Sequence, residues 1–535
     1  MQGTINTHRN SAHRNFLTDI HHTGWWIFIF AVFVRLVYFA WSQSSPYLYH
    51  ANTDEAFYID YARALISGKH YVYDNFMDPM LSWLLVLPMS LTDNLYLARF
   101  GMLLLDSVNA VLMYALCLMY TRNRLAACVC GVLYALYSMT LTYSVFLTKV
   151  TPVITLLLLI VYCFFYAIRN KQKWGFLLAG FASALLFFLG AGFLLLILAY
   201  VILLFFFREC RQGAFWYLAG IVVMLTTCLL TCRIIDPQKS LMPTNGGIVF
   251  YIANHADNPW GTHYHPAFVK EATPTGIYHA FREEAQHRDA TIITDQQVSL
   301  YWYKQTLNEN LQQPGMALQR LLHKWLLLMS NDEISQNYYL PYIRQETLKG
   351  MPLPGFALVL GFGLTGLLLL ARRDIYTLLL VMPIAVTFLI GSLFFVSSRM
   401  RLPMVPFLVI GVSLWFSVNY FTNYHVKALV LALLLVFASY GIQLFTTKPP
   451  SPYSKYALAV TMVHARMFNE ADVLLDQALK EKRVGKYLAL KALVKSYQGK
   501  CTEALPLYDE ALELDASLTE ARENREICER YLQSQ

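Results

Sequence analysis

Two adjacent carboxylates follow the first long apolar stretch of the chain, in Asn52-Thr53-Asp54-Glu55-Ala56-Phe57-Tyr58. A carboxylate is costly to hold beside lipid, so an acidic pair next to a membrane needs a reason. We interpret Asp54 as a general base and Glu55 as a supporting group, because adjacent residues of a helix do not share a face. The alternative is a structural helix start with Thr53 as N-cap, where the helix dipole favours acids.

Three basic side chains could complete such a site. Lys149 precedes one apolar stretch, and Arg399 and Arg401 precede another. Cations at a membrane surface suit a phosphate, and arginine can bind two of its oxygens at once. The alternative for each is snorkelling to lipid headgroups. The later stretch begins Arg401-Leu402-Pro403-Met404-Val405-Pro406, and its prolines either shape the backbone around a ligand or occupy an ordinary first helical turn.

Long apolar stretches must position these groups. Of 535 residues, 56% are hydrophobic and 14% are charged, which soluble domains rarely show. Runs of roughly 17–25 apolar residues can span a bilayer as helices. We therefore predict an all-α polytopic membrane protein with a membrane domain at 25–446 and about eleven spans, at about 25–43, 97–120, 125–143, 149–168, 173–189, 191–207, 214–235, 354–371, 375–396, 402–421 and 427–446.

Basic residues between these stretches set the orientation. With eleven spans they fall on one side, from Arg9 and Arg14 before the first span to Lys427 at the last. The positive-inside rule then makes the N-terminal segment 1–24 cytoplasmic and the C-terminal segment extracytoplasmic, and we expect the inner membrane of a bacterium. The net charge of +8 forms no patch, so we predict no nucleic-acid partner.

Two outer loops follow from this topology. The first, 44–96, contains an apolar stretch at 80–91 that is too short to span and is expected to lie in the interface. The second, 236–353, has a turn signal, a strand-like run at 248–252 and a helical middle at about 276–328. We therefore expect a mixed loop domain outside the membrane.

The outer tail, 449–535, contains an internal repeat. Its pattern recurs with an offset of 33 residues, as in Ala471 and Ala504, or Ala478 and Ala511. Two such units and a final helix at 518–532 resemble tetratricopeptide repeats, which present surfaces to protein partners. A plain helical bundle is the alternative. So short an array would lean on the membrane domain or on a partner for stability.

The other titratable residues give a weaker signal. No metal-ligand spacing occurs; we predict no definite cofactor and leave a divalent metal open. Asp106 lies inside a span and must face protein or water, so we expect an ion pair with Arg35. Cys501 and Cys528 of the tail could form a disulfide. We interpret four histidines of the second outer loop as surface or loop-packing residues: His255, His263, His265 and His279.

Together, the motifs resemble the GT-C glycosyltransferases, above all the protein O-mannosyltransferase and bacterial lipid A aminoarabinose transferase types. The resemblance covers roughly residues 25–420, and the order of the motifs is more specific than any one of them. The stretch Gly246–Asn254 is similar to the outer loop of bacterial members with tetratricopeptide tails. The other shared motifs are Asp54–Tyr58 after the first span, Arg35 within it, Ala98-Arg99-Phe100 at the second span and Arg399–Pro406 at a late one.

The resemblance implies a sugar donor linked to a polyprenyl phosphate, used on the outer face with inversion. The acceptor would be a hydroxyl of a protein or glycolipid. Asp54 would take the acceptor proton, with Glu55 as its support, and Arg399 or Arg401 would face the lipid phosphate.

The chain departs from this family at two positions. Relatives often have a lysine before a proline pair in the first outer loop, where this chain has Asp78-Pro79-Met80, and often a glutamate where Lys149 stands. We hypothesise that Lys149 holds the phosphate in place of the missing lysine. Tyr58 and Asp78 are candidates for contacts to the acceptor or the sugar.

Two other classes stay open. One is a transporter or flippase of lipid-linked glycans, although no pair of matching interrupted spans indicates inverted repeats. The other is a non-enzymatic membrane scaffold that presents the tail to a partner. A scaffold needs no Asp54, so Asp54→Asn separates it from an enzyme. Among enzymes, a sugar polymerase or an O-antigen ligase also stays open.

Overall fold

The regular secondary structure of the described chain consists of helices. The computed structural model describes residues 2–51, 53–73, 75–235, 243–270, 273–349, 351, 353–418, 422–445 and 451–534, with side chains from residue 22 onward (Ile235 apart). Within these residues every regular element is a helix and no strand occurs. The all-α class is therefore confirmed.

Apolar helices account for each of the eleven predicted spans. Seven helices of the described chain are long and apolar enough to cross a membrane: His22–Ser42 of α1 (Gln2–Ser42), α4 (Tyr96–Thr121), α7 (Val150–Asn170), Arg208–Ile234 with α10 (Arg211–Ile235), α17 (Ile375–Leu393), Ser398–Ser417 and α20 (Asn423–Phe445). Four predicted spans form shorter apolar helices: α5 (Arg124–Ala135), α8 (Lys173–Leu189), Ala191–Phe206 with α9 (Leu194–Phe206), and Phe356–Leu370 with α16 (Phe356–Thr365). The chain is a multi-pass membrane protein.

Two predicted spans differ from the structure in their bounds. The stretch 125–143 is not one helix, because α5 ends at Ala135 and α6 (Ser138–Tyr143) begins after an extended Tyr137. The stretch 402–421 starts earlier, at α18 (Ser398–Arg401), and continues as α19 (Val405–Leu414); residues 419–421 lie outside the described chain. Hydropathy reports composition only, so it records neither a break in a helix nor a polar first turn.

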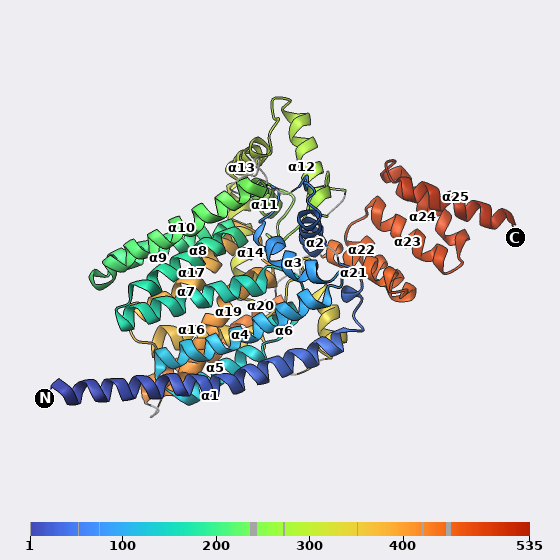
Figure 1. The fold of residues 1–535 in the computed structure, drawn as a ribbon. Helices are drawn as coiled ribbons and strands as arrows, with labels where there is room; N and C mark the ends of the chain where they lie inside the picture. The colour runs from blue at the N-terminus through green and yellow to red at the C-terminus, as the bar shows by residue number, and fades with distance from the viewer. Residues whose placement is uncertain are drawn as a thin grey trace.

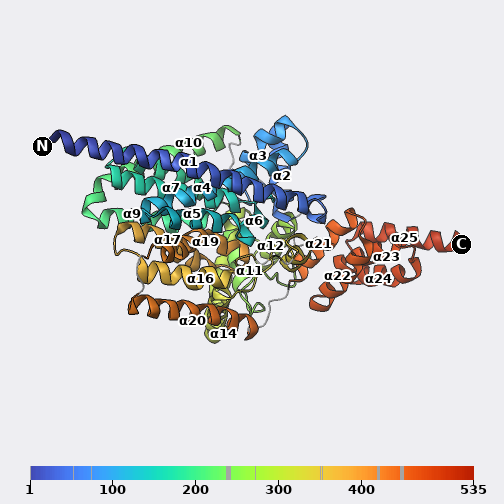
Figure 2. The ribbon, with the colours of Figure 1, turned by 90° about the horizontal axis from the view of Figure 1, so that it is seen from below.

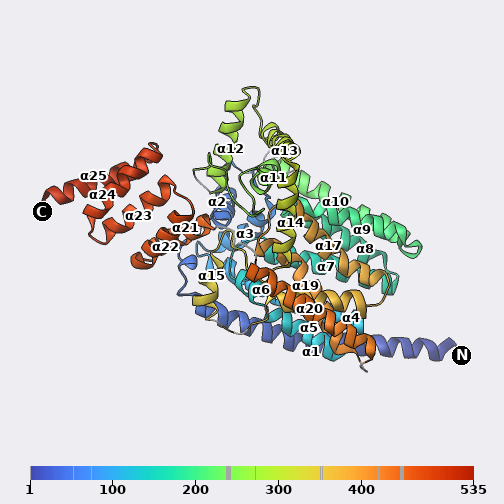
Figure 3. The ribbon, with the colours of Figure 1, turned by 180° about the vertical axis from the view of Figure 1, so that it is seen from behind.

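The long helices lie side by side in one bundle, with α1 and α20 on opposite sides of it (Figures 1 and 2). The N-terminus and the C-terminal tail lie at opposite ends of the molecule (Figure 3). The end nearer the tail, called the outer end after the predicted topology, carries the elements α2 (Thr53–Ile66), α3 (Met80–Leu91), α11 (Gly246–Asn254), α12 (Pro274–Arg288), α13 (Asp295–Gln312) and α14 (Pro314–Met329).

Glycines allow close helix contacts in the bundle, for example between α8 and α10. A Cβ atom on Gly180 would lie 2.2 Å from the carbonyl oxygen of Tyr217, and one on Gly220 would lie 2.2 Å from that of Leu177. Lipid offers no hydrophobic driving force between helices, so small residues that admit close backbone packing stabilise the pair.

A buried ion pair joins α1 to α4. Arg35 Nη2 lies 2.5 Å from Asp106 Oδ2, and the two side chains are 0% and 1% exposed. Tyr134 of α5 donates its hydroxyl to Asp106 Oδ1 at 2.6 Å. The predicted pairing of Asp106 with Arg35 is confirmed, and the pair acts in the bundle core, away from the outer end.

Every regular element among the described residues of the second outer loop is a helix, so the strand-like run predicted at 248–252 is wrong. The run at 248–252 belongs to α11, which packs on α13 so closely that a Cβ on Gly247 would lie 1.8 Å from the carbonyl oxygen of Ser299. Gly247 also donates its N–H to Ser299 Oγ at 2.9 Å. Five apolar residues in a row suit a buried strand or a buried helix equally, and the partner helix decides between them.

The tail contains five helices among the described residues from 451 onward: α21 (Pro452–His464), α22 (Phe468–Glu481), α23 (Gly485–Tyr497), α24 (Cys501–Leu514) and α25 (Thr519–Ser534). The repeated alanines, such as Ala471 and Ala504, are fully buried where these helices meet. Cys501 and Cys528 are buried and not bonded to each other. The tail contacts the outer end of the bundle, where Lys482 Nζ donates to the carbonyl of His265 at 3.1 Å.

Candidate active site

Asp54 lies in the first turn of α2, at the outer end of the bundle. The preceding Thr53 has φ +57°, which is unusual for a β-branched residue and is the kind of local strain that gathers at functional sites. Asp54 Oδ2 accepts from Arg399 Nη1 at 2.6 Å, across 345 residues of sequence. The side chains are 16% and 10% exposed, so the pair is mostly shielded from water.

A second ion pair lies in the same place. Lys149 Nζ is 2.5 Å from Asp78 Oδ2, with the side chains 26% and 9% exposed. Lys149 is the N-cap residue of α7, and Asp78 lies just before α3. The two departures from the family motif, at Asp78 and at Lys149, are thus partners in the structure.

Both pairs line one cavity of about 520 Å³. Its charged end is formed by Asp54, Asp78, Lys149 and Arg399. The rest of its wall is mainly apolar and comes from the ends of spanning helices and from the outer loop, for example Leu189, Phe193, Val249, Ile252, Ile390 and Phe394. The cavity therefore combines a cluster of two cation–carboxylate pairs with a mainly apolar wall.

The electrostatics keep Asp54 ionised. Burial acts to raise the pKa of Asp54, but the Arg399 guanidinium, the Asn337 amide and the Lys149 ammonium outweigh it, and the pKa lies below its usual value. Asp54 is therefore a carboxylate at neutral pH, as a proton acceptor must be. With Arg399 bound to it, however, it is a weaker base than an isolated aspartate.

Glu55 points away from the cavity into a buried network. Its side chain is 1% exposed and lies 2.9 Å from Arg99 Nη2. It also accepts from the Leu147 N–H at 3.2 Å and from the Tyr338 hydroxyl at 3.3 Å. Glu55 thus connects α2 to α4, to the loop that carries Lys149 and to the segment that carries Asn337. Its role is to position these segments.

Arg401 does not reach the cavity, contrary to expectation. It is 2% exposed, pairs with Glu333 Oε2 at 3.1 Å and donates to the carbonyl of Ser330 at 2.5 Å. Residues i and i+2 of a helix point to nearly opposite sides, so α18 can turn only one of its two arginines toward Asp54. That residue is Arg399, and Arg401 instead fixes the start of the segment 330–340.

Tyr58 also differs from its predicted role. It lies one turn after Asp54 on α2, but its side chain is 1% exposed and does not line the cavity. Burial raises the pKa of Tyr58 well above its usual value, and the charges of Asp54 and Asp78 add to the rise. Of the two predicted contacts to acceptor or sugar, only Asp78 is at the cavity.

Lining residues that the sequence did not indicate include Gln336 and Asn337, and also His263, which we had interpreted as a surface or loop-packing residue. Burial lowers the pKa of His263 to about 4, although the charge of Asp54 acts the other way, so its ring is neutral at pH 7. These residues lie in loops without a motif, and only their contacts reveal them. Within the described residues, no group of three or more His, Cys, Asp or Glu could hold a metal ion.

Comparison with known proteins gives matches among solved structures. No protein-family model and no curated protein matches the chain. Among solved structures it is similar to ArnT from Cupriavidus metallidurans, in a crystal structure bound to undecaprenyl phosphate. The sequences are 14% identical, the match covers 91% of this chain and 80% of ArnT, and the TM-score is 0.40.

Proposed function

We propose that the chain is a GT-C-type glycosyltransferase that moves a sugar from a polyprenyl-phosphate donor to a hydroxyl acceptor outside the membrane. The observation that carries the proposal is the two-ended cavity, with two cation–carboxylate pairs at one end and apolar walls at the other. A lipid-linked phosphate has the same two ends. Its phosphate fits beside Arg399 and Lys149, and its isoprenoid chain fits along the apolar wall.

In the proposed reaction the acceptor oxygen attacks the anomeric carbon of the sugar. The bond from that carbon to the phosphate oxygen breaks, and the lipid phosphate leaves with the bonding electrons. Asp54 takes the acceptor proton, a contribution of about 10²–10⁴-fold for a positioned base. Arg399 and Lys149 stabilise the charge that grows on the leaving phosphate. Attack from the side opposite the phosphate inverts the anomeric centre.

The resting ion pairs couple donor binding to this chemistry. Without donor, Arg399 is held by Asp54 and Lys149 by Asp78. A phosphate competes with both carboxylates for these cations. As Arg399 turns toward the phosphate, the effect of burial on the pKa of Asp54 is less opposed, so Asp54 becomes a stronger base when the donor is in place.

A matched pair of variants tests the proposal. Asp54→Asn and Asp60→Asn each remove one carboxylate from α2, but Asp60 is on the solvent side, 3.4 Å from Arg63. With donor lipid extracted from the host membranes and purified protein in detergent, Asp54→Asn should abolish transfer and Asp60→Asn should retain it. Asp54→Asn should still bind undecaprenyl phosphate, because the competing anion is gone.

The same assay separates the alternatives. A flippase needs a membrane and gives no glycan product in detergent. A scaffold gives none either, and in cells its Asp54→Asn variant keeps the wild-type phenotype. Transfer by wild type that survives Asp54→Asn would remove Asp54 as the base.

We also propose that the outer end faces away from the cytoplasm of a bacterium. Lys149 begins α7 at the site and Lys171 ends α7 at the other end of the bundle, where the other loop cations that support this orientation also lie in the sequence. The tail, as a short tetratricopeptide-like array, would then be available outside to a protein partner.

A further inference from the structure

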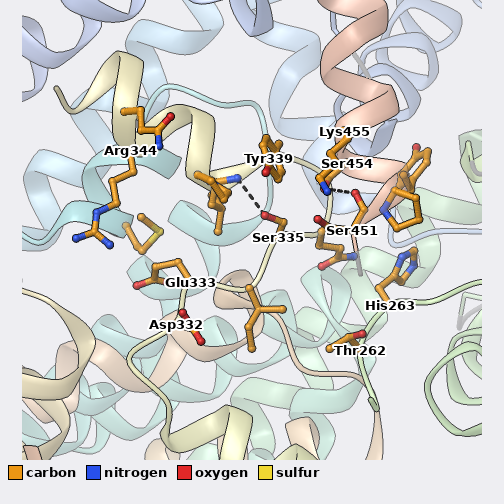
Figure 4. A pocket seen from close by; sticks show the side chains of 18 of the residues that line it. Thr262, His263, Asp332, Glu333, Ser335, Tyr339, Arg344, Ser451, Ser454 and Lys455 are labelled. Atoms are coloured by element: carbon orange, nitrogen blue, oxygen red, sulfur yellow. Dashed lines mark hydrogen bonds between the residues drawn. The ribbon is translucent and has the colours of Figure 1, made fainter. Parts of the chain in front are cut away.

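A larger cavity lies beside the Asp54 cavity, between the outer loops and the start of the tail. It measures about 830 Å³, and most of its wall comes from residues within 262–270, 331–358 and 451–487. Figure 4 shows side chains from these three parts of the chain around one space. Three side chains, His263, Gln336 and Tyr453, line both cavities. A ligand in the larger cavity is therefore one side chain away from the cavity of Asp54.

Two buried polar atoms in this wall have no hydrogen-bond partner within the described chain, Thr262 Oγ1 and His265 Nε2. The two residues are 3% and 6% exposed. Burial lowers the pKa of His265 well below its usual value, with His263 and Lys482 adding to the effect, so the ring is neutral at pH 7. Buried polar groups are nearly always paired, and a polar ligand in the cavity would pair these two.

The charges of the wall nearly cancel. The lining residues that the structure describes include four cations and three anions. The cations are Lys270, Arg344, Lys455 and Lys482, and the anions are Asp332, Glu333 and Glu481. Most are already paired: Lys455 with Glu481, Lys270 with Asp515 and Glu333 with Arg401. A ligand of low net charge suits such a wall.

The remaining polar groups of the wall are mostly amides and hydroxyls, with tyrosine rings among them, such as Tyr339 and Tyr487. A neutral sugar carries donors and acceptors on its rim and an apolar patch on its face, so it matches alternating polar groups and aromatic faces. A peptide is usually held at a sheet edge or in an apolar helix groove, and the described chain has no strand.

We propose that this cavity binds a carbohydrate of neutral sugars, held between the outer loops and the tail helices α21 and α22. As the acceptor of the transfer, a role that rests on the proposed function, it would present its reacting hydroxyl to Asp54 across the wall of His263, Gln336 and Tyr453. The first tail helices are then part of the acceptor site and not only a surface for partners.

Array binding with the full-length protein in detergent tests the proposal. The probes are short neutral oligosaccharides and, on the same surface, peptides rich in serine and threonine. Thr262→Val removes the unpaired hydroxyl at nearly constant shape, and Thr502→Val makes the same change at an exposed position of α24. Thr262→Val should bind oligosaccharide roughly tenfold more weakly without a lower melting temperature, because only a ligand uses that hydroxyl. Thr502→Val should bind as wild type does.

Three results would overturn the carbohydrate assignment: capture of the peptides instead, capture of neither probe, or equal oligosaccharide binding by wild type and Thr262→Val. Failure of the proposed function gives a different pattern. If the wild-type protein transfers no sugar but oligosaccharide binding still depends on Thr262, the cavity remains a carbohydrate site and the transferase proposal falls.

Discussion

Removal of the cation beside Asp54 should change the pKa of that carboxyl by an amount set by the geometry. The nitrogen–oxygen distance to Arg399 is 2.6 Å, and both side chains are mostly buried. Opposite charges centred about 4 Å apart attract by about 4 kcal/mol at an effective dielectric constant of about 20. One pKa unit corresponds to about 1.4 kcal/mol, so the upper bound is about 3 units. Arg399→Gln should raise the pKa of Asp54 by about 1–3 units.

The sign follows from the contributions to the wild-type pKa. Burial raises the pKa of Asp54, and Arg399, Asn337 and Lys149 together bring it below 3.8. The stability that the pair contributes is thus present above the unfolded pKa and is lost as the pH falls through the lower folded pKa. Without Arg399, burial is opposed only by Asn337 and Lys149, and Asp54 should take up its proton at a higher pH than in the wild-type protein.

Infrared difference titration can measure this pKa without any substrate. The signal is the carbonyl band of the protonated Asp54 carboxyl group. It is assigned by its absence from the spectrum of the Asp54→Asn protein. In Arg399→Gln that band should appear at a higher pH than in wild type, whereas Arg399→Lys, which keeps a cation, should stay close to wild type. An unchanged titration in Arg399→Gln would refute the view that Arg399 controls the charge of Asp54.

Three further outcomes are expected. Lys149→Glu leaves Asp78 without its cation and adds a negative charge, so the affinity for undecaprenyl phosphate, measured by native mass spectrometry, should fall by roughly 30-fold or more, while Lys149→Arg retains it; unchanged binding would exclude Lys149 from the phosphate site. Glu55→Gln leaves the buried Arg99 charge unpaired and should lower the free energy of unfolding by about 3–5 kcal/mol, read as a lower melting temperature; a normal melting temperature with lost transfer would instead give Glu55 a chemical role. Gly180→Val should prevent close packing of α8 on α10 and reduce the yield of folded protein, whereas Gly101→Val, where a Cβ meets nothing within 4 Å, should not; equal yields would contradict the packing account.

The local pattern of apolar and charged residues was enough to predict most helices of the fold. An apolar helix lies within each predicted span, although 125–143 is broken after Ala135, and the ion pair of Arg35 with Asp106 followed from the cost of a lone charge inside a membrane. The helices of the tail also followed from the spacing of Ala471 and Ala504. The run at 248–252 was too short to show a period, so its helix depended on packing against α13.

For the candidate active site too, some features follow from the sequence and others only from the tertiary structure. The sequence by itself determined that Asp54, Lys149 and Arg399 stand at the ends of apolar stretches, because hydropathy and residue type are properties of short segments. Only the tertiary structure decided that Arg399 and not Arg401 meets Asp54, that Lys149 meets Asp78, and that Glu55 is buried against Arg99. These partners are up to 345 residues apart. Which face of a helix turns toward a cavity is set by packing against distant segments, and no local pattern records it.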